Sequence, residues 1–325
     1  MANLPITMAL EHYDRHVPFF DGSVTIEGVD LTVLHVAQSA AGRHGSRRHE
    51  RMLAGEFDVA ELSLSSYLMA RDRGLPFTAI PVFPRRLFSQ SRIYVNAASG
   101  ITRPGDLVGR RVGLNSYQTT LSVLAKGDLA HEYGVPWKEI TWVLASDEAV
   151  PFTPPPDVRL ERVPAGGRLD EMLLSGALDA VALPHPPRSI QDAGPRVRRL
   201  FTDARAEEAA YFRRNGYWPI MHVMAFKEAL VHAHPWLPGA VFAAFERAKA
   251  LSREYYADPN WSRLAWARYY EEEEAERLAP DPWPFGLAAN RANLARFVEY
   301  SYEQGLIGQR MAPESLFVEV ATGSA

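Results

Sequence analysis

The sequence has no cysteine among its 325 residues. Disulfides, thiolate zinc sites and cysteine nucleophiles are therefore excluded. Long hydrophobic runs are also missing, because no stretch approaches the ~18 consecutive apolar residues of a membrane-spanning helix. Positive charge is not in excess either, since 35 lysines and arginines stand against 39 aspartates and glutamates, a net charge of -4. We therefore expect neither a membrane nor a nucleic acid as a partner.

Several motifs of known chemistry are absent as well. There is no glycine-rich phosphate loop and no G-x-S-x-G nucleophile turn. No second histidine completes an H-E-x-x-H motif after His49 and Glu50. His232 and His234 lie two residues apart, and both a metal pair and a surface pair remain open. We expect no tightly bound structural zinc.

The N-terminal segment MANLPITMALEHYDRHVPFF does not read as a secretory signal. Such a signal needs an uninterrupted apolar run of about 7 to 15 residues. Here Glu11, His12, Asp14 and Arg15 interrupt any such run. The sequence therefore predicts a cytoplasmic protein.

Apolar stretches of strand length alternate with helical patterns along the first two thirds of the chain. Residues 6–10, 30–36, 78–83 and 92–96 indicate strands, and RVGL, EITWVL and ALDAVALP indicate further ones. The last third is mostly helical, and the acidic run Glu271–Glu274 is typical of a solvated helix face. Alternation of this kind predicts an α/β fold with parallel sheets.

Specific segments along nearly the whole chain carry a family resemblance. In order they are HYDR (12–15), RML and GEFDVAELSLSSYL (within 51–68), PVFPRRLF (81–88), YVN (94–96), GRRVGLNSYQTT (109–120), YWPIMH (217–222), HPW (234–236), WPFGLAANR (283–291) and YEQGL (302–306). Together they resemble the 4,5-dihydroxyphthalate decarboxylase family. The basic segment 41–50 departs from that pattern.

The resemblance implies a two-lobed α/β fold like that of type II periplasmic binding proteins. Each lobe would be a mostly parallel sheet flanked by helices, with a ligand cleft between the lobes. We expect residues 1–96 and 197–325 in lobe one and residues 97–196 in lobe two, with two chain crossings. Ligands of such folds bind where strand carboxyl ends and helix N-termini converge.

The resemblance further implies decarboxylation of a dihydroxylated aromatic dicarboxylate such as 4,5-dihydroxyphthalate, giving protocatechuate and CO2. A hydroxyl para to the reacting carbon can take up the developing charge, so no cofactor is needed. The site then requires a proton donor, a base at the hydroxyl and cations for the remaining carboxylate. The alternatives are a non-catalytic small-anion solute-binding protein of the ABC-transporter type, a cytoplasmic ligand sensor and an enzyme of another reaction.

His222 is the first candidate for proton transfer, because it ends the apolar run WPIMH and titrates near neutral pH. His12, which follows the first predicted strand, is the second. Glu61 lies within a strand pattern and is suited to orienting a histidine or an arginine. The alternative for His222 is a hydrogen-bonded core histidine, and the alternative for Glu61 is a purely structural ion pair.

Arginines are the candidates for binding carboxylates, because the planar guanidinium matches a carboxylate. Arg85 and Arg86 follow PVFP at a strand end, and we expect one to face the ligand and the other to face water. Arg51 is a third candidate, with a helix-surface salt bridge as its alternative. His185 would reach the ligand from lobe two.

Two strand-to-helix junctions rich in hydroxyl groups predict anion-binding sites, one in each lobe. The candidates in lobe one are Ser65, Ser66 and Tyr67, preceded by Ser63. Those in lobe two are Tyr117, Gln118, Thr119 and Thr120, preceded by Ser116. Ordinary helix capping is the alternative for both junctions, and also for Asn290 and Arg291.

The expected partner is therefore a small aromatic carboxylate, and a homo-oligomer is left open. We expect no cofactor. A divalent ion that bridges His12, Glu61 or His222 to a catechol-like substrate is also left open.

Overall fold

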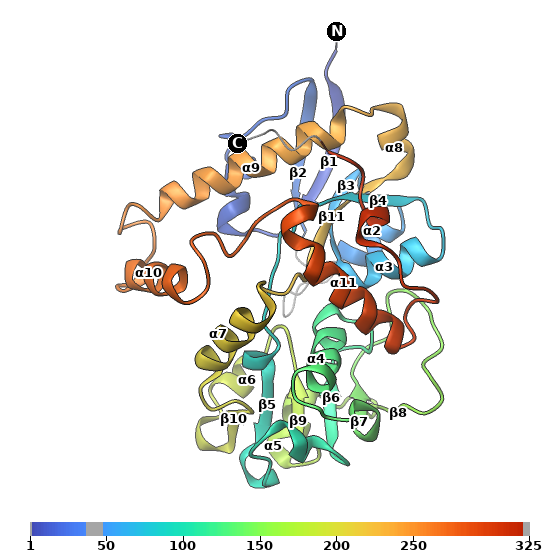
Figure 1. The fold of residues 1–325 in the computed structure, drawn as a ribbon, viewed down its shortest axis with the longest axis vertical. Helices are drawn as coiled ribbons and strands as arrows, with labels where there is room; N and C mark the ends of the chain where they lie inside the picture. Colours follow the sequence, from blue (N-terminus) through green and yellow to red (C-terminus); the bar gives the residue numbers. More distant parts are fainter. Residues whose placement is uncertain (1, 37–47, 321–325) are drawn as a thin grey trace. The chain divides into compact units, whose positions relative to one another are not determined.

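A computed structural model describes residues 2–36 and 48–320 (Figure 1). The chain forms two compact units. The first unit comprises residues 1–85, 222–291 and 311–325, and the second comprises residues 86–221 and 292–310. No helix in the described part of the chain is long and apolar enough to cross a membrane.

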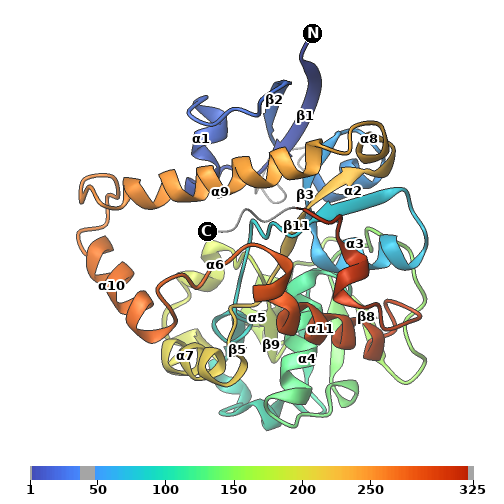
Figure 2. The same ribbon diagram turned by 45° about the horizontal axis from the view of Figure 1, so that its top comes forward.

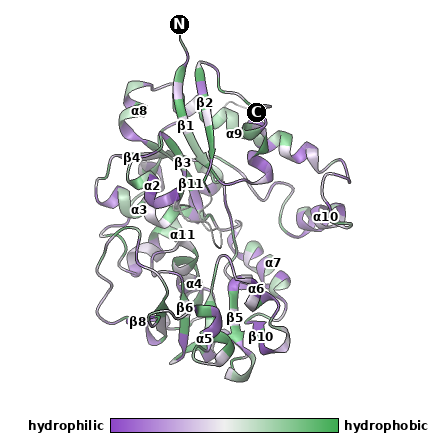
Figure 3. Ribbon diagram, turned by 180° about the vertical axis from the view of Figure 1, so that it is seen from behind, coloured by the Kyte–Doolittle hydropathy of each residue, from purple (hydrophilic) through white to green (hydrophobic). Residues whose placement is uncertain are grey.

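The described part of the first unit contains a five-stranded sheet with the order β2-β1-β3-β11-β4. Its strands are β1 (Leu4–Leu10), β2 (Val29–His35), β3 (Val59–Ser63), β4 (Phe77–Ile80) and β11 (His222–Lys227). β1 pairs in parallel with β2 and β3, whereas β11 is antiparallel to both β3 and β4. Every residue of β3 is buried, and Figure 3 shows hydrophobic colour along much of the sheet. This sheet is therefore the core of the first unit.

The described part of the second unit contains a six-stranded sheet with the order β10-β5-β9-β6-β7-β8. Its strands are β5 (Ile93–Asn96), β6 (Arg111–Leu114), β7 (Thr141–Leu144), β8 (Arg159–Arg162), β9 (Ala180–Ala182) and β10 (Val197–Arg199). β6 to β9 are mutually parallel, and β5 runs against β9 and β10. Each sheet therefore has one strand that runs against the others, β11 in the first unit and β5 in the second.

Helices flank both sheets. The first unit has α1 (Val17–Phe20), α2 (Arg48–Leu53), α3 (Leu64–Asp72), α8 (Glu228–Ala233), α9 (Leu237–Tyr255) and α10 (Ala267–Arg277). The second unit has α4 (Thr120–His131), α5 (Leu169–Ser175), α6 (Arg188–Gln191) and α7 (Ala204–Asn215). α11 (Leu287–Glu303) begins in the first unit and continues into the second. Short 3-10 turns lie at 14–16, 90–92, 97–99, 104–107, 137–139, 194–196 and 313–316.

The unit boundaries differ from the predicted ones. Residues 86–96 and 197–221 belong to the second unit rather than to lobe one, because β5 pairs with β9 and β10. Residues 292–310 also belong there, since Tyr300 donates a hydrogen bond to Asp128 of α4 and Gln304 donates one to the carbonyl of Val123. The chain thus passes between the units four times, after residues 85, 221, 291 and 310, and not twice. The predicted cleft between the lobes stays a prediction.

Candidate active site

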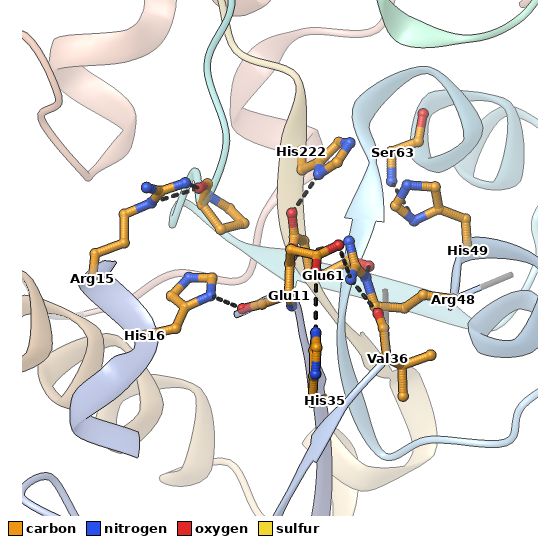
Figure 4. Close-up of polar contacts among 11 residues, drawn as sticks. Glu11, Arg15, His16, His35, Val36, Arg48, His49, Glu61, Ser63 and His222 are labelled. Atoms are coloured by element: carbon orange, nitrogen blue, oxygen red, sulfur yellow. Dashed lines mark hydrogen bonds and ion pairs between the residues drawn. The ribbon is translucent and has the colours of Figure 1, made fainter. Parts of the chain in front are cut away.

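Several ionisable side chains lie close together at the carboxyl edge of the first sheet (Figure 4). Glu11 directly follows β1, His35 ends β2 and Ser63 ends β3. His222 begins the antiparallel β11 and is paired with Ser63, while Glu61 lies opposite Met224. The apolar run WPIMH ends at His222, and the strand β11 begins at that residue. Because β11 runs opposite to β3, its first residue and the end of β3 share one edge of the sheet.

Glu61 and His222 form a buried carboxylate–imidazole pair. Oε1 of Glu61 lies 2.5 Å from Nδ1 of His222. Glu61 is 0% exposed and His222 is 5% exposed. Nδ1 must carry the proton in this pair if Glu61 is ionised, so the lone pair of the neutral ring lies on Nε2. Within the described residues, Nε2 of His222 makes no hydrogen bond.

Arg48 holds Glu61 in its ionised form. Its Nη2 lies 3.1 Å from Oε2 of Glu61, and its Nε donates to the backbone carbonyl of Glu61 at 3.1 Å. Nη1 donates to the carbonyl of Val36 and lies 3.5 Å from Oε2 of Glu11. Burial alone would raise the pKa of Glu61, but the charge of Arg48 and the interaction with His222, which includes a hydrogen bond, outweigh it and hold the pKa well below its usual range. Glu61 is therefore a carboxylate at neutral pH.

The histidines around this pair are neutral at pH 7. Burial lowers the pKa of His222 to about 4, against the opposing attraction of Glu61. The His49 ring lies 4.8 Å from the His222 ring, edge to face, and burial lowers the pKa of His49 well below its usual value. Burial also lowers the pKa of His16 to about 4, and its Nδ1 lies 2.9 Å from the carbonyl of Glu11. His222 is therefore neutral at pH 7, with Nε2 unprotonated.

Arg85 and Tyr13 supply further polar groups that act on this pair. Arg85 is half-buried, and within the described residues its guanidinium makes no hydrogen bond or ion pair. Its charge opposes protonation of His222 and favours ionisation of Tyr13, so it acts on both side chains. Burial and the charge of Glu61 nevertheless raise the pKa of Tyr13 well above its usual value. Tyr13 therefore remains a hydrogen-bond donor at neutral pH.

The segment that carries Arg85 is fixed by Arg15. The Nε of Arg15 donates to the carbonyl of Pro84 at 2.8 Å, and its Nη2 donates to the same oxygen at 2.5 Å. The Arg15 guanidinium lies over the rings of Tyr13 at 4.1 Å and Trp283 at 4.3 Å. One cation thus positions both Tyr13 and the backbone before Arg85.

The other predicted catalytic and arginine candidates lie elsewhere. His12 is exposed, and its ring packs beside Phe20 at 5.0 Å and His35 at 5.6 Å. Arg51 forms an exposed salt bridge with Glu56, which is the alternative raised for it. Arg86 was expected to face water if Arg85 faced the ligand, and this is wrong. Arg86 is 2% exposed, because it donates to the carbonyl of Trp218 at 2.6 Å inside the second unit.

The hydroxyl-rich junction of the first unit is formed as predicted, with β3 ending at Ser63 and α3 beginning at Leu64. Ser65 and Ser66 are buried in the first turn of α3. Tyr67 is also buried, and its hydroxyl donates to the carbonyl of Leu316. The Tyr67 hydroxyl is thus already used in the packing of the C-terminal segment, which corrects its expected place among the ligand-binding groups.

The junction of the second unit is occupied by a side chain of the chain itself. The backbone N–H groups of Tyr117 and Gln118 donate to the Glu148 carboxylate at 2.7 and 3.0 Å. These two amides are therefore not open to an external anion, contrary to the expectation. The side chain of Gln118 bonds both backbone groups of Val150.

The remaining candidates lie in the second unit or in the first turns of α11. Tyr117 is buried and donates through its hydroxyl to the carbonyl of Gln304 at 3.1 Å. The Thr119 hydroxyl lies 2.9 Å from that of Ser116, and Thr120 is buried at the start of α4. His185 is exposed in the loop after β9. Asn290 donates to the carbonyls of Pro284 and Gly286, while Arg291 pairs with Glu314.

The sequence pattern did not identify Arg48, Tyr13, His49 or Glu148 as site residues. Tyr13 lies inside the HYDR motif, which was the one available signal for it. Arg48 and His49 belong to the basic segment 41–50, whose other residues up to 47 lie outside the described part of the chain. Searched over the described residues, no group of three or more histidines, aspartates and glutamates could hold a metal ion.

Proteins of known name are similar in sequence to this chain. A 4,5-dihydroxyphthalate decarboxylase from Comamonas testosteroni is 34% identical to this chain. The alignment covers 98% of this chain and 97% of that relative. A 4,5-dihydroxyphthalate decarboxylase from Pseudomonas putida is 33% identical to this chain. The alignment covers 67% of this chain and 84% of that relative. A family described as NMT1/THI5 like matches residues 27–152.

Solved structures show the same fold. The periplasmic aliphatic sulphonate binding protein SsuA from Escherichia coli superposes with a TM-score of 0.57 at 14% identity, over 97% of this chain and 98% of that one. The predicted fold class, an α/β fold like that of periplasmic binding proteins, is thereby confirmed, as is the predicted family resemblance.

Proposed function

We propose that this chain, which belongs to the 4,5-dihydroxyphthalate decarboxylase family, is a carboxy-lyase that releases CO2 from 4,5-dihydroxyphthalate or a close analogue without a cofactor. Family membership rests on the relative that is 34% identical over 98% of the chain. The observation that carries the chemistry is the neutral imidazole of His222, bonded to an ionised, buried Glu61 and influenced by the charge of Arg85, which has no ion pair among the described residues.

The proposed reaction begins at the hydroxyl para to the carboxylate that leaves. Nε2 of His222 accepts the hydroxyl proton, and Glu61 stabilises the imidazolium that forms. The electron pair of the oxygen moves through the ring to the para carbon, which takes a proton from water and becomes tetrahedral, leaving a hydroxide ion. The bond to the carboxylate then breaks, CO2 leaves, and the electron pair restores the aromatic ring. The hydroxide combines with the released CO2 as bicarbonate. Return of the proton from His222 to the oxygen gives the neutral catechol product, protocatechuate.

Arg85 and Tyr13 are proposed to hold the substrate during these steps. The Arg85 guanidinium would pair with the carboxylate that remains on the ring, which is a favourable geometry for a planar cation. The protonated Tyr13 hydroxyl would donate to a substrate oxygen. A neutral base next to a fixed cation suits this reaction, because the phenolate that forms is stabilised by positive charge without a metal.

The competing function is capture of a small anion without chemistry, and the fold shared with a sulphonate-binding protein favours it. Incubation of the purified protein with 4,5-dihydroxyphthalate and related aromatic dicarboxylates, followed by ultraviolet absorbance and by CO2 release, separates the two. We expect turnover without added cofactor. Tight binding with no turnover across the panel would reject the decarboxylase. The cytoplasmic location stays a prediction, which fractionation of cells that make the protein would test.

A further inference from the structure

Glu11 lies beside the Glu61–His222 pair, but the proposed reaction gives it no part (Figure 4). It directly follows β1, the strand that lies between β2 and β3 in the first sheet (Figure 2). Its backbone N–H donates to Oε2 of Glu61 at 3.2 Å. Its backbone carbonyl lies 2.9 Å from Nδ1 of the buried His16, which holds this peptide group in place. The main chain of Glu11 therefore fixes the oxygen of Glu61 that does not contact His222.

The side chain of Glu11 contacts two further residues of the same unit. Its Oε2 lies 3.5 Å from Nη1 of Arg48, and its Oε1 lies 3.3 Å from Nε2 of His35. The side chain of Arg48 is fully buried, whereas that of Glu11 is 22% exposed. Nη2 of Arg48 lies 3.1 Å from Oε2 of Glu61 at the same time. One buried guanidinium thus contacts two carboxylates, one inside the sheet and one at its edge.

Two carboxylates that share one guanidinium act on each other. Because both contact Arg48, they lie on the order of 6 Å apart, where at an effective dielectric constant of ~20 one charge raises the proton affinity of the other by roughly 10- to 100-fold. The charge of Glu11 thus opposes part of the effect of Arg48 on Glu61. Glu61 still stays ionised, since its pKa lies well below its usual range. A carboxylate of higher proton affinity accepts a stronger hydrogen bond from Nδ1 of His222 and better stabilises the imidazolium.

We propose that Glu11 is a positioning residue for the Glu61–His222 pair, which it fixes through its backbone N–H and makes more basic through its carboxylate. The backbone contact restrains Oε2 of Glu61. The charge makes His222 a stronger base toward a substrate hydroxyl. This kinetic consequence rests on the proposed decarboxylation, because Glu11 acts on the reaction only through the pair. The strength of the hydrogen bond between Glu61 and His222 is a second consequence, and it does not rest on any reaction.

The first test removes the charge of Glu11 and keeps its shape. In Glu11→Gln, we expect kcat for CO2 release to fall by about 3- to 30-fold and KM to change by less than about twofold, because His222 is then a weaker base. Glu11→Asp keeps the charge and should retain most of the wild-type kcat. Glu27→Gln is the matched control, since Glu27 is exposed in the turn before β2, and it should leave kcat unchanged. A wild-type kcat in Glu11→Gln, or an Asp variant as slow as the Gln variant, would overturn the role of the charge.

The second test observes the hydrogen bond by nuclear magnetic resonance in the substrate-free protein. The Nδ1 proton of His222, assigned by its loss in His222→Asn, should resonate far downfield, because it lies between the ring and an ionised carboxylate at 2.5 Å. This resonance should move upfield in Glu11→Gln and keep nearly its wild-type position in Glu11→Asp and Glu27→Gln. A purely structural role of Glu11 predicts no difference between the Gln and Asp variants.

The two tests separate this inference from the proposed function. If the protein turns over no aromatic dicarboxylate but the resonance of His222 moves as expected, the decarboxylase is rejected and the role of Glu11 in the pair is kept. If the resonance stays at its wild-type position in Glu11→Gln, the carboxylate does not act on the pair. The proposal for Glu11 is then wrong, even where the protein releases CO2.

Discussion

His222→Asn is expected to remove catalysis while leaving substrate binding largely intact. Groups that transfer a proton in the transition state contribute about 10²–10⁴-fold, so kcat should fall by that factor and KM should change far less. Asparagine can still donate to Glu61 through its side-chain amide, so the buried carboxylate keeps a partner. His12→Asn is the matched control, because His12 is exposed and its ring packs beside Phe20 and His35. It should change kcat by less than about threefold.

The pH profile shows which protonation state of His222 is active. With a pKa of about 4, roughly 99.9% of the enzyme holds a neutral His222 ring at pH 7. Because the reaction starts from the neutral form, kcat/KM should be flat between about pH 5.5 and 8. An imidazolium acting as the acid would instead lose activity tenfold per pH unit above about pH 4. Such a decline, or a His222→Asn variant that retains full activity, would refute the proposed role.

Further outcomes follow from the same contacts. Arg85→Ala should raise KM by about 10- to 100-fold with a smaller effect on kcat, whereas Arg86→Ala should act on stability, which steady-state kinetics and thermal melting distinguish. The folded chain keeps His16 and His222 neutral down to about pH 4, while the unfolded chain protonates them near 6.5. The free energy of unfolding in urea should therefore fall between pH 6.5 and 4, by ~3 kcal/mol for each histidine. Burial raises the pKa of Asp128 to about 7, so its contribution to that free energy falls as pH rises from about 4 to 7, and Asp128→Asn should remove this slope. Dialysis against a chelator should leave activity unchanged, and activity lost on dialysis but restored by a metal would contradict this.

Local pattern was enough to place most of the strands along the sequence and part of the site. Glu61 was expected inside a strand and Ser63 at a strand-to-helix junction, and both lie there, in β3 and before α3. These positions follow from hydrophobic periodicity and from the preference of serine for helix starts. Periodicity also indicated a strand near His222, but it did not give the direction of β11, which depends on pairing with β3 and β4.

Contacts between distant segments could not be predicted in this way. Arg48 lies in a basic run that is typical of a solvated surface, yet it is 0% exposed because Glu61 and the carbonyl of Val36 surround it. Glu148 is about 30 residues from the two amides that it binds, at Tyr117 and Gln118. The three-residue strand β10 carries no clear pattern, and its pairing with β5 shifts the unit boundary. Each of these features depends on which segments meet, and composition does not encode that.

The buried ion pair between Arg48 and Glu61 is better explained by chemistry than by stability. Two charges lose their hydration on burial, and apolar side chains of similar volume often stabilise a fold equally well or better. What an apolar pair cannot provide is an ionised carboxylate at 2.5 Å from Nδ1 of His222. That carboxylate fixes the tautomer with a free Nε2 and stabilises the imidazolium once a proton arrives. We infer that Arg48 serves to keep Glu61 ionised where burial would otherwise protonate it, so a residue of the basic segment 41–50 sets the protonation state of the Glu61–His222 pair.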